Sequence, residues 1–537
     1  MLVLHYESSA NLPSTLVHAN HILLNSRDSV IVALHDLEPG HRVQVAERSI
    51  PVREFIPAGH KMAIREIAVD TPVFKYGWSI GLATLAIAPG RHVHSHNLAC
   101  SHTIDLEAIS TEVPDDLEPL DEFTFEGFER APGSSGRVRV GTRNYLAIIS
   151  NVNCSASVSK LIANRFDRAA LAAFPNIDGV VSFRHGSGCA MAYDGSRHRM
   201  LTRVLGGMAK HPNIGGFLLV GLGCEQGTLD HLVRSQKLYQ IESAGNNGSG
   251  DEDAVPVLSI QNSGGTRATV ELGCELVANM LPRVNEAKRT TVSASHLMLA
   301  TECGGSDGYS GITANPALGV AGDRLVACGG TVILSETSEI YGAEHLLTRR
   351  ARSRAVAEKL LERIEWWKWY CNNYGEELDN NPSVGNKAGG LTTITEKSLG
   401  AVSKGGTTAL EAVYEYAEPV EQRGFVVMDS PGFDPASVTG MVAGGANLVA
   451  FTTGRGSCFG FKPTPSFKIA SNSRLFARLS EDMDFNAGQV VEGRTVQEVG
   501  RDLFLRLLAT ASGEMTCSEK LDLGDEEFVP WQVGPVL

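Results

Sequence analysis

Short apolar runs alternate with segments of helical spacing over most of this sequence. Each run has the length of a buried strand and opens into a loop rich in Gly, Ser, Asp and Asn, which a helical segment follows. Strands that alternate with helices predict α/β domains with mostly parallel sheets, of the Rossmann-like kind. The runs occupy residues 145–149, 179–183, 216–220, 296–300, 425–428 and 447–451.

The first hundred residues follow a different pattern. They consist of short β-rich segments, and a Pro-Gly or Ala-Gly pair precedes each new strand, at Pro39-Gly40, Ala58-Gly59 and Pro89-Gly90. Turns at such regular spacing are typical of a compact all-β module. We therefore predict a small barrel or β-clip over residues 1–101.

The rest of the chain is expected to contain two α/β domains. With 537 residues, the protein is too long for a single hydrophobic core. Residues 102–136 are acidic and carry prolines, so we predict a linker there. A polar crossing near residue 290 then separates a first α/β domain, residues 137–290, from a second, residues 291–537.

Composition and charge exclude several classes of protein. A net charge of -14, without any Lys/Arg run that has interleaved aromatic residues, argues against a nucleic-acid partner. The amino terminus lacks the basic region of a signal peptide, and no apolar run reaches membrane-spanning length. We expect a cytoplasmic protein without a membrane segment. Its 10 cysteines include no CxxC pair, which favours reduced thiols over a disulfide scaffold or a zinc ribbon.

Polar groups are concentrated in the stretch from Thr301 to Gly319, which directly follows an apolar run. Its glycines would let the backbone approach a ligand closely. Since ligands bind at the carboxyl ends of strands in open α/β sheets, we expect this loop to bind a small polyhydroxylated molecule or a metal. The alternative is a Gly-rich connection without chemistry. The polar residues are Glu302, Cys303, Ser306, Asp307, Thr313 and Asn315.

Four cysteines lie just past apolar runs, namely Cys154, Cys189, Cys224 and Cys303. In one parallel sheet they would all lie at the same edge, where they could approach one another. They could hold an iron ion or cluster. The alternative is that they are small residues packed beneath loops.

Histidines alternate in the segment His92-Val-His94-Ser-His96. Alternate residues of an extended segment share a face, so the three imidazoles are presented together. Three histidines on one side suit a divalent transition metal with open positions. A polar edge strand with solvated histidines is the alternative.

Two later loops carry groups that suit an anionic ligand. Asn386 and Lys387 lie in a Gly-rich loop, where the ammonium group could bind a carboxylate or transfer a proton. A solvated surface lysine is the alternative. Arg455 follows Thr453 and is flanked by glycines, so its guanidinium could bind a carboxylate through two hydrogen bonds.

Several separate motifs resemble one known family. The segments ECGGSDGYSGITANPALG, GLGCE, NPSVGNKAGG, TTGRG and HVHSHN are together similar to the altronate and galactarate dehydratases, which are sugar-acid hydro-lyases unrelated to the enolase superfamily. The likeness covers nearly the whole chain. In that family a small amino-terminal SAF domain, a β-clip, precedes a large α/β body, which is the order predicted above.

The resemblance implies a metal-dependent carbon–oxygen lyase. Such an enzyme dehydrates a C6 aldonate or aldarate to a 2-keto-3-deoxy acid with iron(II) or, in some members, manganese(II). The HVHSHN segment resembles the altronate type, so the expected reaction converts D-altronate to 2-keto-3-deoxy-D-gluconate. The segment from Thr124 to Asn144 is equally compatible with the galactarate type, which gives 5-keto-4-deoxy-glucarate.

The reaction also suggests roles for the candidate residues. Dehydration removes a weakly acidic proton next to a carboxylate and expels a poor leaving group, so a Lewis acid helps both steps. The histidine segment, with cysteine or glutamate from the α/β loops, is expected to hold the metal. His185 or Glu302 would act as base or acid, and Lys387 and Arg455 would hold the carboxylate. Hydroxyl groups would be recognised by Ser306, Asp307, Thr313 and Asn315.

Two rival functions are compatible with the same residues. A non-catalytic sugar-acid binding protein would bind its ligand without iron and without chemistry. A related lyase could act on a different leaving group, as in sulfolactate elimination, although the resemblance suggests that its two domains are separate chains. The size of the chain and its mobile first domain favour a homodimer.

Overall fold

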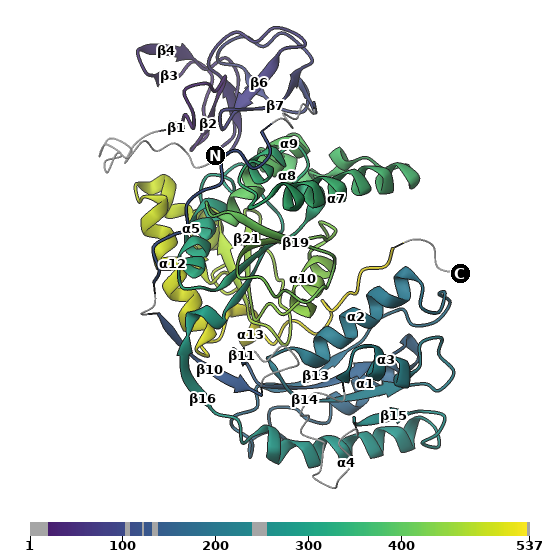
Figure 1. Cartoon of the computed structure of the whole chain (residues 1–537). Coiled ribbons are helices and arrows are strands. Elements are labelled where there is room, and N and C mark those ends of the chain that lie inside the picture. The colour runs from purple at the N-terminus through teal and green to yellow at the C-terminus, as the bar shows by residue number, and fades with distance from the viewer. Residues whose placement is uncertain (1–19, 102–107, 121–122, 132–137, 239–254, 534–537) are drawn as a thin grey trace.

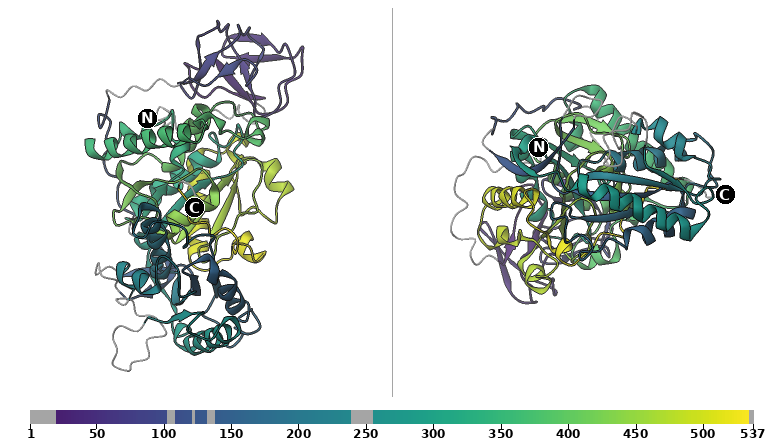
Figure 2. Two further views of the ribbon diagram at one scale, coloured as in Figure 1. Left: turned by 90° about the vertical axis from the view of Figure 1, so that its right-hand side faces the viewer. Right: turned by 90° about the horizontal axis from the view of Figure 1, so that it is seen from below.

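The computed structural model describes residues 20–101, 108–120, 123–131, 138–238 and 255–533. Three parts are stacked along the long axis of the molecule (Figure 1). A β-rich amino-terminal part lies at one end, a large part with a parallel sheet lies in the middle, and a smaller part with a parallel sheet lies at the other end. The same stacking is visible after a quarter turn about the vertical axis (Figure 2).

The β module, residues 20–101, contains strands and turns but no helix among its described residues. Its strands form antiparallel sheets in the orders β1-β2-β5-β8, β3-β4 and β6-β7-β9. Tyr76 and Gly77 join β6 to β7 with positive φ of 60° and 78°, as in tight two-residue hairpins. The Asp28 carboxylate accepts hydrogen bonds from both of their N–H groups. The strands are β1 (His21–Ile22), β2 (Val30–Ala33), β3 (Arg42–Val45), β4 (Arg48–Pro51), β5 (Lys61–Ala63), β6 (Pro72–Lys75), β7 (Trp78–Ala83), β8 (His92–Val93) and β9 (Leu98–Ala99).

The four-strand domain has parallel strands in the order β13-β12-β14-β15. Both faces of its central strand, Tyr145–Ser150, are buried, which explains the continuous apolar run in the sequence. Its elements are β12 (Tyr145–Ser150), α1 (Ala156–Ala163), β13 (Gly179–Phe183), α2 (Ser196–Lys210), β14 (Ile214–Gly221), α3 (Leu229–Ser235), β15 (Val257–Ser259) and α4 (Thr266–Val284).

The seven-strand domain has parallel strands in the order β19-β20-β18-β17-β21-β22-β23. Its strands are β17 (Met298–Cys303), β18 (Thr331–Leu334), β19 (Leu410–Tyr414), β20 (Gly424–Met428), β21 (Leu448–Thr453), β22 (Ser466–Ala470) and β23 (Phe485–Asn486). Its helices are α5 (Ala314–Ala327), α6 (His345–Thr348), α7 (Arg354–Asn373), α8 (Val384–Ala388), α9 (Ile394–Ala401), α10 (Asp434–Ala443), α11 (Ser473–Arg478), α12 (Val496–Ala511) and α13 (Cys517–Lys520).

The two parallel sheets share a hydrophobic core. Residues of β12, α2 and α10 pack with residues of β17, β18 and β20 in one buried cluster. On its other face the seven-strand sheet is covered by α5 and α12, and the four-strand sheet is covered by α1 and α4. The two domains therefore form one layered body with α2 and α10 between the sheets.

A small antiparallel sheet joins the two domains. It consists of β10 (Thr124–Arg130), β11 (Arg139–Gly141) and β16 (Arg289–Ser293), in the order β11-β10-β16. β10 falls inside the predicted linker, so the prediction of a linker over 102–136 was wrong for this part. The acidic, proline-bearing composition of the region hid this strand, in which Phe125 and Phe128 are buried. Residues 102–107, 121–122 and 132–136 of the predicted linker lie outside the described residues.

The β module is attached to the seven-strand domain by a buried group of charges. Lys61 and Lys75 donate to the two carboxylate oxygens of Glu396 at 2.9 and 2.8 Å. Burial opposes ionisation of Glu396, but the two lysines outweigh it and lower the pKa of this carboxyl to about 2. The interface is therefore specific, because separating the parts would leave charges without partners.

The predicted fold class is confirmed: a β-clip-like module precedes two α/β domains with mostly parallel sheets. No helix in the described part of the chain is both long and apolar enough to cross a membrane.

Candidate active site

Three neighbouring strands of the seven-strand domain lead into acidic side chains. β17 ends at Glu302 and Cys303, β18 is followed by Glu336 and Glu339, and β20 leads into Asp434 at the start of α10. The order β20-β18-β17 is parallel, so the carboxyl ends of these strands lie at one edge of the sheet. The fold thus gathers these groups in one place.

A thiol, two carboxylates and two lysines form the first half of this acidic cluster. The Cys303 thiol lies 3.5 Å from a carboxylate oxygen of Glu336 and 3.5 Å from one of Glu339. Lys404 donates to Glu336, and Lys397 donates to Glu339 at 2.6 Å. All five side chains are buried. The lysines come from α9 and the turn after it, so their approach depends on the packing of that helix.

Glu302, Glu336 and Asp434 form the second half, with one oxygen of each within 4.8 Å of the others. Glu302 Oε2 accepts a hydrogen bond from Ser437 at 2.7 Å. Its Oε1 is buried and has no hydrogen-bond partner among the described residues. A Cβ at Gly304 would lie 2.4 Å from the Asp434 carboxylate, so a glycine is needed there.

Burial and mutual repulsion shift the protonation of these acids. Burial raises the pKa of Glu302 well above its usual value, and the charge of Glu336 raises it further. The same two causes raise the pKa of Asp434 to about 7. Glu339 is different: burial opposes its ionisation, but the charges of Lys397 and Lys404 and the hydrogen bonds to this carboxylate together outweigh burial and lower its pKa.

This donor set fits a divalent cation. The four carboxyl groups of the cluster face two ammonium groups, so ionised carboxylates would exceed lysines by two charges. A buried excess of charge is costly unless it is compensated. Carboxylate oxygens and a thiolate are also suitable ligands for iron(II), and the carboxylates suit manganese(II). Glu302 Oε1, which accepts no hydrogen bond from the described residues, is a further acceptor of this cluster.

Hydrogen bonds within the protein occupy three of the four residues expected to recognise substrate hydroxyls. Asp307 Oδ1 accepts from the N–H groups of Tyr309 and Ser310 and from the Ser471 hydroxyl. The Thr313 hydroxyl contacts the carbonyl oxygens of Tyr309 and Ser471 at 3.0 and 2.6 Å. These contacts fix the loop after β17.

Asn315 and Ser306 differ in whether the protein already provides hydrogen-bond partners for their side chains. Asn315 donates to the Gly400 carbonyl and accepts from Thr452. The Ser306 hydroxyl is buried and has no partner in the described part of the chain. Ser306 is therefore the member of this set that has a free hydroxyl for a ligand.

The residues of the later loops lie beside this loop. Asn386 completes the capping box that Ser383 begins at the start of α8, and it donates to the Ser306 carbonyl at 2.8 Å. The Thr453 hydroxyl accepts from the N–H of Gly456. The backbone N–H of Arg455 donates to the Gly305 carbonyl at 2.9 Å.

Two cations of these loops have uncommitted side chains. Lys387 is half-buried and Arg455 is exposed. No hydrogen bond or ion pair to the end of either side chain is present within the described ranges. Both remain available to an anionic ligand.

The predicted histidines gather at the interface of the β module, where the structure adds His60. Rings of His60, His92 and His94 lie 5.1 to 5.2 Å apart, and His96 lies 5.6 Å from His92. His60 Nδ1 and His92 Nε2 are 3.0 Å apart, and His94 Nε2 lies 2.9 Å from the Lys387 carbonyl oxygen. Burial lowers the pKa of His60 to about 4 and that of His92 to about 3, so the rings are neutral.

His185 and three of the four cysteines lie in the four-strand domain instead. His185 Nε2 lies 2.9 Å from the Ser150 carbonyl oxygen, and its Nδ1 accepts from the N–H of Ser187 at 3.1 Å. Both ring nitrogens are therefore engaged with the backbone. The prediction that Cys303 shares one sheet edge with Cys154, Cys189 and Cys224 was wrong, because the chain builds two separate parallel sheets and Cys303 ends a strand of the other one.

Sequence analysis missed five members of the cluster, namely Glu336, Glu339, Lys397, Lys404 and Asp434. Lys397 and Lys404 follow no apolar strand, so strand-end reasoning could not find them. Asp434 lies in the DSPGFD segment after a predicted strand, and this acidic, Gly-containing loop was the available signal.

A second group with metal-ligand chemistry lies on the surface of the four-strand domain. Ligand atoms of Asp194, His198 and His231 lie within 4.8 Å of one another. However, His198 Nδ1 accepts from the N–H of Asp194 at 3.0 Å, and its Nε2 faces Gly227, where a Cβ would lie 2.0 Å away. This histidine has little room for an ion.

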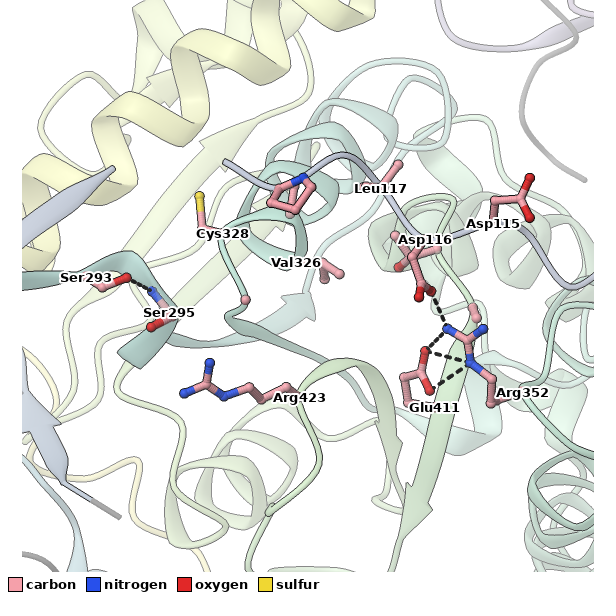
Figure 3. A pocket seen from close by; sticks show the side chains of 15 residues that line it. Asp115, Asp116, Leu117, Ser293, Ser295, Val326, Cys328, Arg352, Glu411 and Arg423 are labelled. Carbon is pink, nitrogen blue, oxygen red and sulfur yellow. Dashed lines mark hydrogen bonds and ion pairs between the residues drawn. The ribbon is translucent and has the colours of Figure 1, made fainter. Parts of the chain in front are cut away.

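A cavity of about 420 Å³ lies at the opposite edge of the seven-strand sheet (Figure 3). Ser293 and Ser295 precede β17, and Arg423 precedes β20, so this cavity faces the amino ends of the strands. Arg352 spans one wall and pairs with Asp116 and Glu411. The cavity is therefore separate from the acidic cluster.

Comparisons with known proteins agree with this geometry. The SAF domain of the altronate/galactarate dehydratases matches residues 19–101. The second domain of the D-galactarate dehydratase/altronate hydrolase family matches residues 127–285, and the C-terminal domain of the D-galactarate/altronate dehydratases matches residues 294–536.

Whole relatives are similar over nearly their full length. The altronate dehydratase of Escherichia coli (strain K12) is 35% identical over 504 residues, which cover 94% of this chain and 97% of the relative. That of Bacillus subtilis (strain 168) is 34% identical over 93% of this chain and 97% of its own length. The galactarate dehydratase (L-threo-forming) of Escherichia coli (strain K12) is 35% identical over 92% of this chain and 93% of its own length. The chain therefore belongs to the altronate/galactarate dehydratase family.

Proposed function

We propose that this protein is a metal-dependent sugar-acid dehydratase that converts D-altronate to 2-keto-3-deoxy-D-gluconate. The observation that carries the proposal is the buried cluster at the carboxyl edge of the seven-strand sheet, where carboxylates and a thiol meet two lysines. Similarity to two altronate dehydratases supports the choice of substrate. Equal identity to a galactarate dehydratase makes galactarate the second candidate, with 5-keto-4-deoxy-glucarate as its product.

The residues of the cluster divide into a metal-holding and a proton-moving set. Cys303, Glu336 and Glu339 would hold iron(II) or manganese(II), which supplies Lewis acidity to the substrate carboxylate and the leaving hydroxyl. Glu302 and Asp434 form no ion pair with a lysine in the part of the chain that the structure describes, so we assign them the transfer of protons to and from the substrate. His185 has both ring nitrogens engaged elsewhere, which is why it is not assigned this role.

The rim of the cluster would position the substrate. Ser306 offers a free hydroxyl to a substrate hydroxyl. Lys387 and Arg455 carry uncommitted cationic ends and would bind the carboxylate. The histidines of the β module would cover the loop that carries Lys387, because His94 contacts the backbone carbonyl of Lys387.

The experiment is anaerobic turnover of purified protein loaded with ferrous ion. The panel contains altronate, galactarate, glucarate, gluconate and mannonate, and the 2-keto-deoxy product is measured. We expect one substrate to dominate, with activity lost on chelation and restored by iron(II) or manganese(II). Binding of a sugar acid without turnover would favour a binding protein, and turnover of sulfolactate alone would favour the related lyase.

We also propose a cellular compartment and an oligomeric state for the active protein. None of the ten cysteines, all of which lie in the described ranges, forms a disulfide, and four of them are exposed, which suits a reducing compartment such as the cytoplasm. The size of the chain favours a homodimer. Mass measurement in solution would test the second point, and a monomeric mass in active protein would refute it.

A further inference from the structure

The cysteine-bearing loops of the four-strand domain lie side by side. They follow β12, β13 and β14, which are adjacent in the order β13-β12-β14. Ile149 pairs with Phe183 and Ser150 with Val220, so the three strands end at the same level. Cys154, Cys189 and Cys224 then follow these ends within a few residues.

Hydrogen bonds hold the three loops together. The backbone N–H of Asn153 donates to the Ser187 carbonyl at 2.8 Å, and the Asn153 side chain donates to the His185 carbonyl at 3.1 Å. The Asn151 side chain donates to the Gly227 carbonyl at 2.6 Å. The backbone next to each cysteine is therefore fixed by its neighbouring loop.

The three thiols are free, exposed and close to one another. Cys154 and Cys224 are both near enough to Cys189 to act on its thiol electrostatically. One N–H group of a neighbouring side chain points at a sulfur atom of this set: the Gln261 side chain donates to Cys224 at 3.4 Å. A cysteine that only fills a hydrophobic core needs neither an exposed sulfur atom nor a hydrogen-bond donor to that sulfur. Thiolates that bind a metal centre commonly have both.

We propose that Cys154, Cys189 and Cys224 bind an iron–sulfur cluster, with one iron left open to an outside ligand. Three cysteines supply three of the four thiolates that such a cluster takes, and the exposed edge leaves the fourth position to solvent or a ligand oxygen. A single tetrahedral ion would need its sulfur ligands about 3.8 Å apart. The three thiols are not among the described groups whose ligand atoms all lie within 4.8 Å, so a larger centre fits better.

This site is independent of the function proposed above, because the acidic cluster lies in a different sheet. The test is anaerobic reconstitution of the full-length protein with ferrous ion and sulfide, followed by removal of unbound material. Iron and acid-labile sulfide per chain are then measured, together with the visible absorption of sulfide-to-iron charge transfer and the electron paramagnetic resonance spectrum after reduction.

Matched serine variants locate the cluster. We expect the labile sulfide and the visible absorption to be lost in C154S, C189S and C224S, while far-ultraviolet circular dichroism stays unchanged. C458S, which replaces another exposed cysteine, and C303S should both keep the cluster. Wild-type protein that binds iron without labile sulfide, or a triple variant that retains the cluster, would overturn the proposal. Loss of dehydratase activity in C303S with an intact cluster would separate the two sites.

Discussion

One carboxylate oxygen of the buried Glu302 side chain has no hydrogen-bond partner among the described residues. Its neighbours Glu336 and Asp434 are also acidic, and no lysine of the described ranges forms an ion pair with Asp434. Such an arrangement costs free energy of folding, because like charges repel in a medium of low polarity. Sites that retain this cost usually need the charge for binding or catalysis.

Asp434→Asn should separate activity from stability. The amide has nearly the same shape as the carboxylate, and it removes a negative charge that Glu336 and Glu339 disfavour. We expect turnover to fall by about 100-fold or more, while the apparent melting temperature of the metal-free protein stays the same or rises. Steady-state kinetics and thermal unfolding measure the two effects. A clear loss of stability would mean that Asp434 has a structural role instead.

Ser306 and Thr313 provide a matched pair of hydroxyl variants. Ser306→Ala removes a hydroxyl without a protein partner, so we expect KM for the sugar acid to rise by about tenfold, with stability unchanged. Thr313→Val removes two hydrogen bonds to carbonyl oxygens and should cost about 1–3 kcal/mol of stability. An unchanged KM in Ser306→Ala would exclude this hydroxyl from substrate binding.

The sequence predicted correctly that polar residues follow the end of β17, but it did not predict which residues form hydrogen bonds with them. Glu302 and Cys303 could be placed because an apolar run ends directly before a polar loop. The sequence could not indicate that Asp307 and Thr313 are satisfied by Ser471, which lies more than 150 residues away. Lys404 was equally hidden, because its approach to Glu336 depends on how α9 packs.

At the scale of elements, two helices set the distance between the parallel sheets. α2 from one domain crosses α10 from the other inside the shared core. A Cβ at Gly207 of α2 would lie 2.2 Å from the Ala443 carbonyl oxygen, which is far shorter than any normal contact. Only glycine permits this close crossing.

Gly207→Ala should therefore destabilise the protein although alanine favours helix formation. We expect a cost of about 1–3 kcal/mol, because the methyl group meets backbone rather than a movable side chain. Gly385→Ala in α8 is the control: its Cβ would meet only the Ser383 hydroxyl oxygen, at 3.7 Å, which is an ordinary contact. The two melting curves decide the matter, and equal melting temperatures would contradict the close crossing.

Elements themselves were largely predictable, but their assembly was not. The runs at 145–149 and 179–183 correspond to β12 and β13, since buried parallel strands are continuously apolar. β10 escaped prediction because its partner β16 comes about 160 residues later, and antiparallel pairing over that distance leaves no local signal. The lack of a local signal for long-range strand pairing also explains the error about the four cysteines. We expected their strands in one sheet, whereas the protein builds two separate parallel sheets.

At the scale of the whole molecule, buried neutral histidines connect the domains. His211 follows α2, and its Nε2 lies 2.8 Å from the Ala446 carbonyl oxygen of the seven-strand domain. Burial lowers its pKa from 6.5 to about 4. Since the unfolded chain binds this proton more readily than the folded chain, acid favours unfolding between these two values.

His211 should make the joint between the domains sensitive to acid. From pH 7 to pH 5, protonation of His211 in the unfolded state should remove about 2 kcal/mol of stability. His211→Gln lacks this titration, so its stability deficit relative to wild type should shrink as pH falls. Denaturant unfolding at several pH values measures the difference. A deficit that stays constant from pH 7 to pH 5 would rule out the titration of His211 as a cause.

The segment after α13 runs across both α/β domains. Phe528 packs against Phe183 of the four-strand domain, and Trp531 stacks on Trp367 of α7 with ring centroids 5.1 Å apart. Residues 525–533 come after every element that they contact. This segment can therefore pack against the two domains only after the ribosome has made both sheets. The order of synthesis thus postpones the last contacts between the domains. Until then, the aromatic face of α7 is a surface that a chaperone could bind.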